Sequence, residues 1–260
     1  MNILTDRNTA VTVSDETNQF IEGRNAVTEA IKSGRNIDKI YIAAGKTDAT
    51  INRIASLARS SGIVVVTVDR KKLDALSITA AHQGVIASVS AAAYCTLEDI
   101  LENAKKKNEA PLILICDEIS DPHNLGAMLR TAECSGVHGV IVPKRRSSGL
   151  TAVVAKASAG AVEYIPIARV SNLTAAIHTL QDNGIWVFGA AADGDRTIYQ
   201  ADFRGPSAIV IGSEGNGISR LVSEACDFRI GIPMKGQISS LNASVAAAVI
   251  LYEALRQRSN

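Results

Sequence analysis

Three loops in the C-terminal half of the chain contain polar and glycine residues that could do chemistry. The first, DPHNLGAMLRTA at residues 121–132, follows the apolar run LILIC, and in it Asn124 precedes Arg130 by six residues. Pro122 favours an extended entry, and Asn124 can cap the helix that follows. A plain capped helix with a surface arginine would have the same pattern, so this loop alone does not indicate a function.

The second loop, IVIGSEGNGIS at residues 209–219, is rich in glycine. Gly212, Gly215 and Gly217 follow an apolar run and would permit positive φ angles and close approach of a ligand to the backbone. Their G-x-x-G-x-G spacing is neither the dinucleotide-binding G-x-G-x-x-G nor a P-loop. Glu214 lies among them, where a carboxylate would be costly to bury without partners. A nucleotide-like ligand held by backbone groups is plausible here, and a tight exposed turn is the alternative.

The third loop lies within RIGIPMKGQISSLNASVAAAVILYE, residues 229–253. A strand is expected to end at Pro233, a turn follows at Gly236, and Ser240 and Asn242 stand where the next helix should start. That helix is rich in alanine and serine, which would let a neighbouring backbone pack closely. Ser240 as an ordinary N-cap is the alternative to a role in chemistry.

Short β-branched runs alternate with amphipathic segments over nearly the whole chain, which predicts an α/β protein. The first unit of this pattern runs from about Phe20 to Ser90. Residues 91–110 form a bridging segment in which Thr96 can cap a helix with acids in its first turn and lysines in its last. In the first unit we expect helices at 26–33, 47–60 and 71–75, and strands at 39–43, 63–68 and 85–89.

A second α/β pattern begins at Pro111. Several of its strand candidates are apolar without alternation, as strands buried on both faces of a mostly parallel sheet should be. Ligands bind beyond the carboxyl ends of such strands, so loops at that edge are where a site should lie. We expect strands at 112–116, 139–142, 164–167, 185–188, 208–211 and 228–232, and helices near 125–135, 173–182 and 241–257.

The composition limits the classes of function. With 260 residues, 47% hydrophobic and 20% charged, the chain can bury a large core and is not expected to be disordered. Its net charge of +1 means that any nucleic-acid contact must come from local clusters. Scattered cysteines without a C-x-x-C pair favour buried thiols and no metal. The absence of an apolar run of about 18 residues and the polar first 19 residues predict a cytoplasmic protein with a flexible N-terminal tail.

Taken together, the three loops resemble the motifs of the SpoU (TrmH-like) RNA 2′-O-ribose methyltransferases of the SPOUT superfamily. The first motif, N-x-G-x-x-x-R-T, is seen here as Asn124, Gly126, Arg130 and Thr131. The second resembles IGSEGNG at residues 211–217, and the third IPMKGQISSLNASVA at 232–246. All three occur in the right order at the right separations.

The resemblance continues upstream and suggests a subgroup. GRNAV at residues 23–27 and HQGVIA at 82–87 are similar to signatures of the family's N-terminal substrate-binding domain, whose fold is like that of ribosomal protein L30e. This domain and the basic stretch KRRSSGLT at 144–151 are most similar to the RlmB-like methyltransferases, which modify a guanosine ribose of 23S rRNA. The resemblance covers about residues 20–258.

This likeness implies a division of the chain, a cofactor and partners. Residues 1–19 would be a flexible tail, 20–90 an L30e-like RNA-binding domain, 91–110 a linker with a helix, and 111–260 the catalytic domain. That domain would hold a trefoil knot around S-adenosylmethionine, without a metal. The family works as a homodimer, and its substrate would be 23S rRNA or a ribosome precursor.

The likeness also assigns roles to residues by position. Because an arginine stays protonated, we expect Arg130 to grip a phosphate and stabilise the developing alkoxide, not to act as base. His123 beside the first motif is a candidate base, although a packing role is the stronger interpretation. The catalytic set would be Asn124, Arg130, Glu214, Ser240 and Asn242; the cofactor set Gly189, Gly212, Ile232, Met234 and Leu241; and the RNA-binding set Arg24, Asn25, Lys144, Arg145 and Arg146.

Three other interpretations stay open on the sequence. The substrate could be tRNA or another rRNA site, since related enzymes share this layout. The chain could also be a ribosome-assembly protein that binds RNA without catalysis, although the polar motif residues are all in place. A nicotinamide-dependent oxidoreductase is disfavoured because the G-x-G-x-x-G motif is missing.

Overall fold

The computed structural model describes residues 20–45, 48–77 and 79–259. The expected flexible tail, residues 1–19, lies outside this range. The chain folds as two compact units that divide between Ser90 and Ala91. Each unit is α/β, as the sequence pattern predicted.

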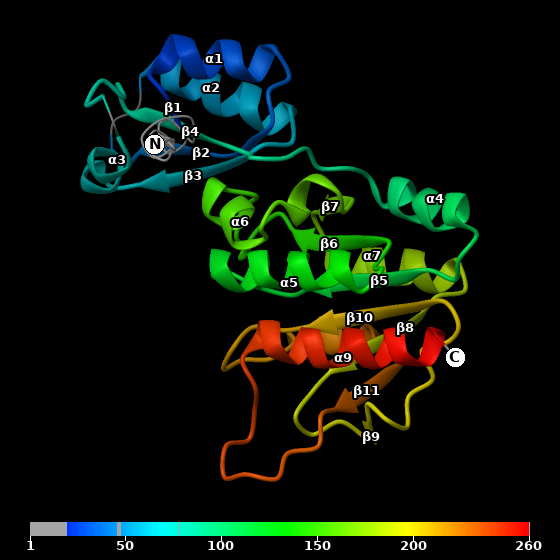
Figure 1. The fold of residues 1–260 in the computed structure, drawn as a ribbon. Helices are drawn as coiled ribbons and strands as arrows, with labels where there is room; N and C mark the ends of the chain where they lie inside the picture. Colours follow the sequence, from blue (N-terminus) through cyan, green and yellow to red (C-terminus); the bar gives the residue numbers. More distant parts are fainter. Residues whose placement is uncertain (1–19, 46–47, 78, 260) are drawn as a thin grey trace, which may run out of the picture. The chain divides into compact units, whose positions relative to one another are not determined.

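The N-terminal unit is a four-stranded sheet with helices. Its strands are β1 (Phe20–Glu22), β2 (Ile37–Ala43), β3 (Val64–Val68) and β4 (Val85–Val89), and its helices are α1 (Arg24–Lys32), α2 (Ala49–Ser60) and α3 (Arg70–Leu76). The sheet has the order β1-β4-β2-β3, in which only the β2–β3 pair is parallel. Helices α1 and α2 pack against each other beside this sheet (Figure 1). The short strand β1 was not predicted, and α1 begins two residues earlier than expected.

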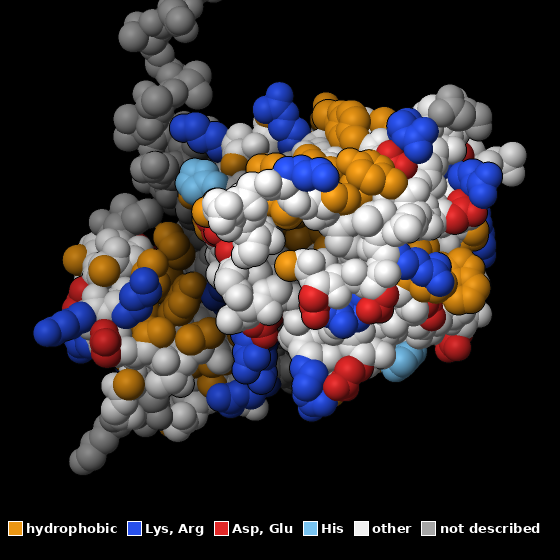
Figure 2. All heavy atoms as spheres, turned by 90° about the horizontal axis from the view of Figure 1, so that it is seen from below, with side chains coloured by type: hydrophobic (Ala, Val, Ile, Leu, Met, Phe, Trp, Pro, Cys, Tyr) orange, Lys and Arg blue, Asp and Glu red, His pale blue; other side chains and the backbone are white. Residues whose placement is uncertain are grey.

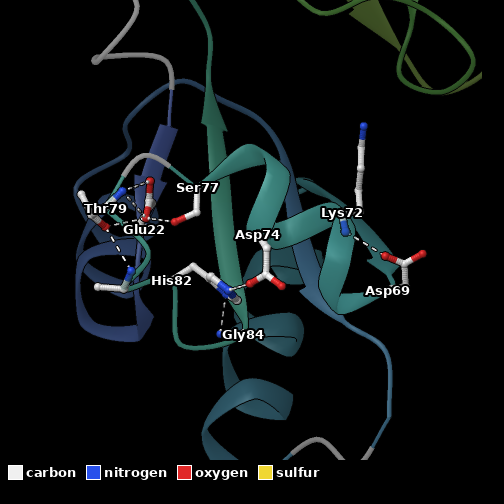
Figure 3. A network of polar contacts seen from close by, with 9 residues as sticks. Glu22, Asp69, Lys72, Asp74, Ser77, Thr79, His82 and Gly84 are labelled. Carbon is white, nitrogen blue, oxygen red and sulfur yellow. Dashed lines mark hydrogen bonds and ion pairs between the residues drawn. The ribbon is translucent and has the colours of Figure 1, made fainter.

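Polar side chains fix the segment that follows α3. Glu22 of β1 accepts hydrogen bonds from the hydroxyls of Ser77 and Thr79, each at 2.6 Å (Figure 3). A carboxylate that accepts short hydroxyl bonds is a strong, charge-assisted anchor. The segment is thereby attached to the edge strand of the sheet.

The same segment is held a second time by His82, which is buried. Its Nε2 atom lies 2.9 Å from a carboxylate oxygen of Asp74, and its Nδ1 accepts the backbone N–H of Gly84 at 3.0 Å (Figure 3). Because Nδ1 is an acceptor, the proton of the neutral ring is on Nε2 and points at Asp74. The next residue, Gln83, accepts a 3.2 Å bond from the Nε of Arg24 through its carbonyl oxygen. The segment and the start of α1 therefore form one fixed surface.

The C-terminal unit begins with helix α4 (Leu97–Lys107), which confirms the predicted cap. Thr96 accepts the backbone N–H of Asp99, and the Asp99 carboxylate accepts the backbone N–H of Thr96 in return. This reciprocal arrangement satisfies two donors that a helix start leaves unpaired. The three lysines of the last turn lie at the negative end of the helix dipole, as expected.

Seven strands form the sheet of this unit, and every neighbouring pair is parallel, which confirms the predicted parallel sheet. The sheet has the order β7-β6-β5-β10-β8-β11-β9. The strands are β5 (Leu112–Cys116), β6 (Gly139–Pro143), β7 (Ile167–Val170), β8 (Trp186–Ala190), β9 (Arg196–Thr197), β10 (Ser207–Ile211) and β11 (Phe228–Gly231).

Helices cover both faces of this sheet, and its central strand β5 is apolar in every position. In β5, Leu114 and Cys116 pack into the core on one face, whereas Ile113 and Ile115 pack into the core on the other. The first core lies under α5 and α9, which pack side by side (Figure 1). The helices of this unit after α4 are α5 (Pro122–Cys134), α6 (Ala152–Ala157), α7 (Leu173–Asp182), α8 (Arg220–Ala225) and α9 (Ala243–Arg258).

Several local expectations were wrong. Asp121, not Asn124, caps α5 by accepting the N–H of His123, and Pro122 is the first helical residue. A proline suits that position because its missing N–H would have had no partner there. The strand expected at 164–167 begins only at Ile167, because residues 161–163 form a short 3₁₀ helix (η1, Ala161–Glu163). Helices α6 and α8 and strand β9 were not predicted.

The strand order of this sheet differs from the order of the strands along the chain. Strand β10 lies between β5 and β8, so the chain crosses the sheet repeatedly before it returns as α9. The trefoil knot that the resemblance implies stays a prediction. In the part of the chain that the structure describes, no helix combines the length and the apolar character that a membrane span requires.

Candidate functional site

A cavity of about 660 Å³ lies at the carboxyl ends of the central strands of the C-terminal unit. Its walls are the segments that directly follow β8, β10 and β11, together with the first residues of α9. This is the edge of a parallel sheet at which ligands bind. Figure 2 shows Lys and Arg side chains interspersed with Asp and Glu on one face of the chain.

The glycine-rich segment after β10 is a tight turn that only these glycines allow. Ser213 and Gly217 exchange two backbone hydrogen bonds, of 3.0 and 2.9 Å. Gly215 and Gly217 have φ angles of +86° and +64°, which side chains disfavour. A Cβ on Gly212 would lie 2.0 Å from the carbonyl carbon of Gly217. At its glycines the turn therefore presents bare backbone to the cavity.

Both ends of this turn are tied to β5 by Asp117, a buried residue that the sequence analysis missed. Its carboxylate accepts the backbone N–H of Ser219 at 2.7 Å, and its own N–H donates to the carbonyl of Ile211 at 2.8 Å. A buried carboxylate is stable only when hydrogen bonds replace its water. The one signal in the sequence was an acid placed directly after a wholly apolar strand.

A polar cluster joins the three predicted loops. The amide of Asn124 donates to a carboxylate oxygen of Glu214 at 2.8 Å, and the amide of Asn242 donates to the side-chain oxygen of Asn124 at 3.0 Å. Asn242 also contacts Glu214 directly. Its side-chain oxygen accepts the N–H groups of Ser244 and Val245 and so caps α9. Asn242, not Ser240, is therefore the N-cap.

The other two predicted catalytic residues lie apart from this cluster. Ser240 is exposed and lines the cavity. Arg130 is exposed on α5, six residues or about 1.7 helical turns beyond Asn124, and does not line the cavity. His123 is also exposed, and its backbone N–H donates a hydrogen bond to the side chain of Asp121.

Four of the five predicted cofactor residues line the cavity, namely Gly212, Ile232, Met234 and Leu241. Gly189 does not, although the next residue, Ala190, does. A Cβ on Gly189 would lie 3.0 Å from the sulfur of Cys226, so this glycine makes room for packing between strand and helix. Because side chains alternate along a strand, the position one residue later faces the cavity.

The cavity also contains an ion pair that the sequence analysis did not point to. Arg229 of β11 contacts Asp193, which follows β8, through one guanidinium nitrogen. The hydrogen bond from Arg229 lowers the pKa of Asp193, and the same bond raises the pKa of Arg229. Both groups are therefore charged at neutral pH.

Three of the thiols are not set up as nucleophiles. Burial raises the pKa of Cys116 and that of Cys226 to about 12, and the pKa of Cys95 to about 11. Since the thiolate is the reactive form, these thiols remain protonated and inert. Among the described residues no group of three or more His, Cys, Asp or Glu could hold a metal ion.

The predicted RNA-binding residues belong to different units. In the N-terminal unit, half-buried Arg24 pairs with Asp48 at 2.7 Å, and Asn25 is exposed. In the C-terminal unit, Arg145 and Arg146 are exposed and Lys144 is partly exposed. Arg146 pairs with Glu118, which raises the pKa of Arg146.

Comparison with known proteins identifies the family. Residues 111–252 match the SpoU rRNA methylase family, and residues 20–95 match the family of RNA 2′-O ribose methyltransferase substrate-binding domains. The chain belongs to the SpoU rRNA methylase family. This confirms the resemblance inferred from the three motifs.

Relatives of similar length share about half of their residues with this chain. A protein of Bacillus subtilis, YacO, that is named for the TrmH family of tRNA/rRNA methyltransferases is 47% identical over 239 residues, which cover 92% of this chain and 96% of that protein. A Staphylococcus epidermidis protein named for the same family is 50% identical and covers 92% and 95%. The similarity therefore extends over both units.

Solved structures share the fold of this SpoU family member. The SpoU methyltransferase AviRb from Streptomyces viridochromogenes, in complex with AdoMet, is 26% identical with a TM-score of 0.58 and covers 93% of this chain and 90% of its own. An AdoMet-bound rRNA methyltransferase from Sinorhizobium meliloti has the same identity and TM-score and covers 93% and 88%. A TrmH/SpoU tRNA-modifying enzyme of A. aeolicus, 28% identical with a TM-score of 0.54, covers 63% of this chain and 84% of its own.

The polar cluster predicts an unequal effect of two N-cap substitutions. Asn242→Ala should lower the free energy of unfolding by about 2 kcal/mol, because it removes the cap, leaves the side-chain oxygen of Asn124 without its donor and takes away one of the two donors to Glu214. Asn172, which caps α7 through the N–H of Ala175 alone, is the matched control, and Asn172→Ala should cost about 1 kcal/mol or less. Urea unfolding measures both values. Equal losses would show that the contacts of Asn242 with Asn124 and Glu214 do not stabilise the fold.

Proposed function

We propose that this chain transfers a methyl group from S-adenosylmethionine to a ribose 2′-hydroxyl of RNA, at a guanosine of 23S rRNA. The observation that carries the proposal is the contact of Asn124, Glu214 and Asn242 beside a cavity made of backbone turns. These residues come from three separate motifs of a methyltransferase family. A protein that only bound RNA would not need this convergence of polar groups at a small-molecule cavity.

The cavity fits the proposed cofactor. Its volume of about 660 Å³ lies within the range of small-ligand sites. The turn around Gly212 offers backbone groups to the polar edges of an adenine, and the side chains of Ile232, Met234 and Leu241 offer apolar surface to its ring. When bound, the cofactor supplies a methyl group on a sulfonium, which is reactive without help from a metal.

The polar cluster would hold the ribose. Asn124 and Asn242 fix the Glu214 carboxylate, which is exposed and so accessible to a substrate hydroxyl. We assign Ser240, at the cavity wall, to the same task of orienting the sugar. Positioning of this kind lowers a barrier because it replaces a bimolecular encounter with a fixed geometry. The hydroxyl proton leaves to a phosphate oxygen, a water molecule or a neighbouring side chain.

Arg130 would contact the RNA backbone from outside the cavity. It is exposed, and a guanidinium can bind a phosphate through two parallel N–H bonds. We do not assign it the role of base, because a guanidinium is a poor proton acceptor in proteins. Its proposed role is to clamp the phosphate and stabilise the negative charge that develops on the attacking oxygen.

The N-terminal unit, residues 20–90, would bind RNA, and residues 111–260 would form the catalytic domain. Arg24 and Asn25 in the first unit, and Lys144, Arg145 and Arg146 in the second, would contact phosphates. Ribosomal RNA is favoured because the tRNA-modifying relative covers only 63% of this chain, whereas the rRNA methyltransferase from Sinorhizobium meliloti covers 93%. A tRNA substrate is the alternative that the experiment below can reveal.

The proposed enzyme is a homodimer that buries the outer face of α9. From Val245 to Tyr252 this helix is apolar all round: Ala247 and Leu251 face the core, whereas Val245 and Tyr252 are 47% and 51% exposed. A helix that is apolar on all sides is normally buried on all sides. A second copy of the chain would supply the missing cover.

Mapping of ribose methylation tests the function. RNA from a strain that lacks this protein should have lost the 2′-O-methyl group of one 23S guanosine, and the purified protein with S-adenosylmethionine should restore it. S-adenosylhomocysteine should raise the melting temperature of the protein, whereas NAD should not. Loss of a methyl group from tRNA instead would identify the alternative substrate. An unchanged map would contradict the proposal.

Arg130→Lys tests the clamp. The substitution keeps the charge but loses the planar fork, so methyl transfer should slow at least about ten-fold while binding of S-adenosylhomocysteine is unchanged. Arg204, which is exposed and pairs with Asp202, is the matched control, and Arg204→Lys should leave the rate as it was. Near-normal turnover of Arg130→Lys would rule out the clamp.

Val245→Glu tests the dimer. A charge on the proposed interface should shift the mass measured by light scattering from that of two chains to that of one. Tyr164→Glu is the control, because Tyr164 is 80% exposed and directly follows η1, so it does not belong to α9. A wild-type protein with the mass of one chain would contradict the dimer.

A further inference from the structure

Arg229 is the one Lys or Arg among the described residues that line the cavity. It lies in the middle of β11, where the next residue, Ile230, points into the core. Its Nε is buried and has no hydrogen-bond partner, and a terminal nitrogen contacts Asp193. A buried donor without a hydrogen bond lowers the stability of the fold by about 1–3 kcal/mol. The folded chain therefore holds a guanidinium here whose donors are not all hydrogen-bonded.

The existing partner leaves room for another acceptor. Asp193 engages one nitrogen of Arg229, and its own side chain is 81% exposed in the segment after β8. An exposed ion pair of this kind adds little stability, so its geometry can change at low cost. The Nε of Arg229 has no partner, the residue lines the cavity, and the planar guanidinium fork matches the two oxygens of a carboxylate.

The charges that line the cavity complement those of the proposed cofactor. The lining contains one cation, Arg229, and two anions, Asp193 and Glu214. S-adenosylmethionine has one anion, its α-carboxylate, and two cations, its α-ammonium and its sulfonium. Each charge of the ligand can therefore meet one of opposite sign, and a phosphate group, by contrast, would face two carboxylates.

We infer that Arg229 binds the α-carboxylate of the cofactor and that Asp193 binds its α-ammonium. This inference rests on the proposed function, because it assigns the part of the same cavity that holds the amino-acid end of the cofactor. The carboxylate fills the donors that Arg229 leaves unpaired, and Asp193 keeps its contact with a cation. Arg229 is a binding residue remote from the reacting atoms.

A kinetic consequence follows from where these charges lie. Methyl transfer removes the positive charge from the sulfur but leaves the carboxylate and the ammonium unchanged. Contacts with these two groups therefore have equal strength before, during and after the reaction. Such uniform binding lowers KM and does not change kcat. Loss of Arg229 should raise KM for the cofactor and leave kcat nearly the same.

Calorimetry with two ligands and the full-length protein tests the assignment. The first ligand is S-adenosylhomocysteine, and the second is 5′-methylthioadenosine, which has the adenosine and the thioether but no carboxylate or ammonium. Arg229→Gln should weaken binding of the first about 10- to 100-fold and leave binding of the second unchanged. Arg220, which forms a surface pair with Glu224 and does not line the cavity, is the control, and Arg220→Gln should change neither affinity.

Each other outcome has a separate meaning. If the wild-type protein does not bind S-adenosylhomocysteine, the proposed function fails. If the wild type binds it and Arg229→Gln binds it as tightly, the inference fails and the function stands. Equal loss of both ligands would show that Arg229 only supports the cavity, and loss of RNA affinity alone would assign it to a phosphate; both results would overturn the inference.

Asp193→Asn gives an independent test if Arg229→Gln does not fold. Asp193 is exposed, so its substitution should not disturb the core. The variant should bind S-adenosylhomocysteine several-fold more weakly and bind 5′-methylthioadenosine, which has no ammonium, as tightly as the wild type does. Equal affinity of Asp193→Asn and wild type for S-adenosylhomocysteine would contradict the assignment of the ammonium.

Discussion

The amide side chain of Asn242 is the contact on which the site depends. Its nitrogen meets Glu214 and Asn124, which are 28 and 118 residues away in the sequence, and its oxygen caps α9. A helix start and a polar cluster are therefore fixed by one group of atoms. Because the amide is planar, its oxygen and its nitrogen have a fixed relative orientation. The direction of the first turn of α9, which the oxygen caps, is therefore coupled to the position of the Glu214 carboxylate, which the nitrogen contacts.

The parallel sheet makes this contact possible. All of its strands end at the same edge, so the segments after β5, β8, β10 and β11 meet there even though they are distant in the chain. The turn after β10 cannot drift, because Asp117 ties both of its ends to β5 and its glycines pack backbone against backbone. The cavity is thus bounded by main chain that has few alternative conformations.

Sequence patterns predicted most of the strands because apolar runs are strong local signals, whereas the residues of the polar cluster were predicted from the resemblance of three motifs to a known family. The strand 112–116 and the helix 173–182 have the predicted bounds, since apolar runs between turn residues leave little choice. The strand expected at 164–167 failed because Tyr164 and Ile165 look like strand residues, while the Gly160 turn starts a 3₁₀ helix. The cap of α5 failed because Asp121 and Asn124 are both good caps, and only Pro122 distinguishes them.

Other parts of the site could not be read from the sequence. A lone arginine in an apolar strand, such as Arg229, is usually a surface residue. Only the folded chain shows that it lines a cavity and that its Nε is buried without a partner. Asp117 has an equally common sequence context. Gly189 was assigned to the cavity, yet the neighbouring Ala190 lines it. Successive residues of a strand point to opposite faces of the sheet, so an assignment that is wrong by one residue selects the wrong face.

The exposure of the polar cluster fits the reaction that we propose for it. Glu214 and Asn242 are exposed, whereas the cavity is lined at its base by the buried residues Ile211, Ile230 and Ala243. A reaction between a small cofactor and a large RNA requires this arrangement, because the cofactor can enter a cavity and a ribose within a polynucleotide cannot. The reacting groups must then meet at the rim. Arg130 is exposed on α5 and does not line the cavity, so in this scheme it would contact the phosphate backbone outside the cavity. The proposed catalytic groups are divided between rim and outer surface because the substrates are so unequal in size.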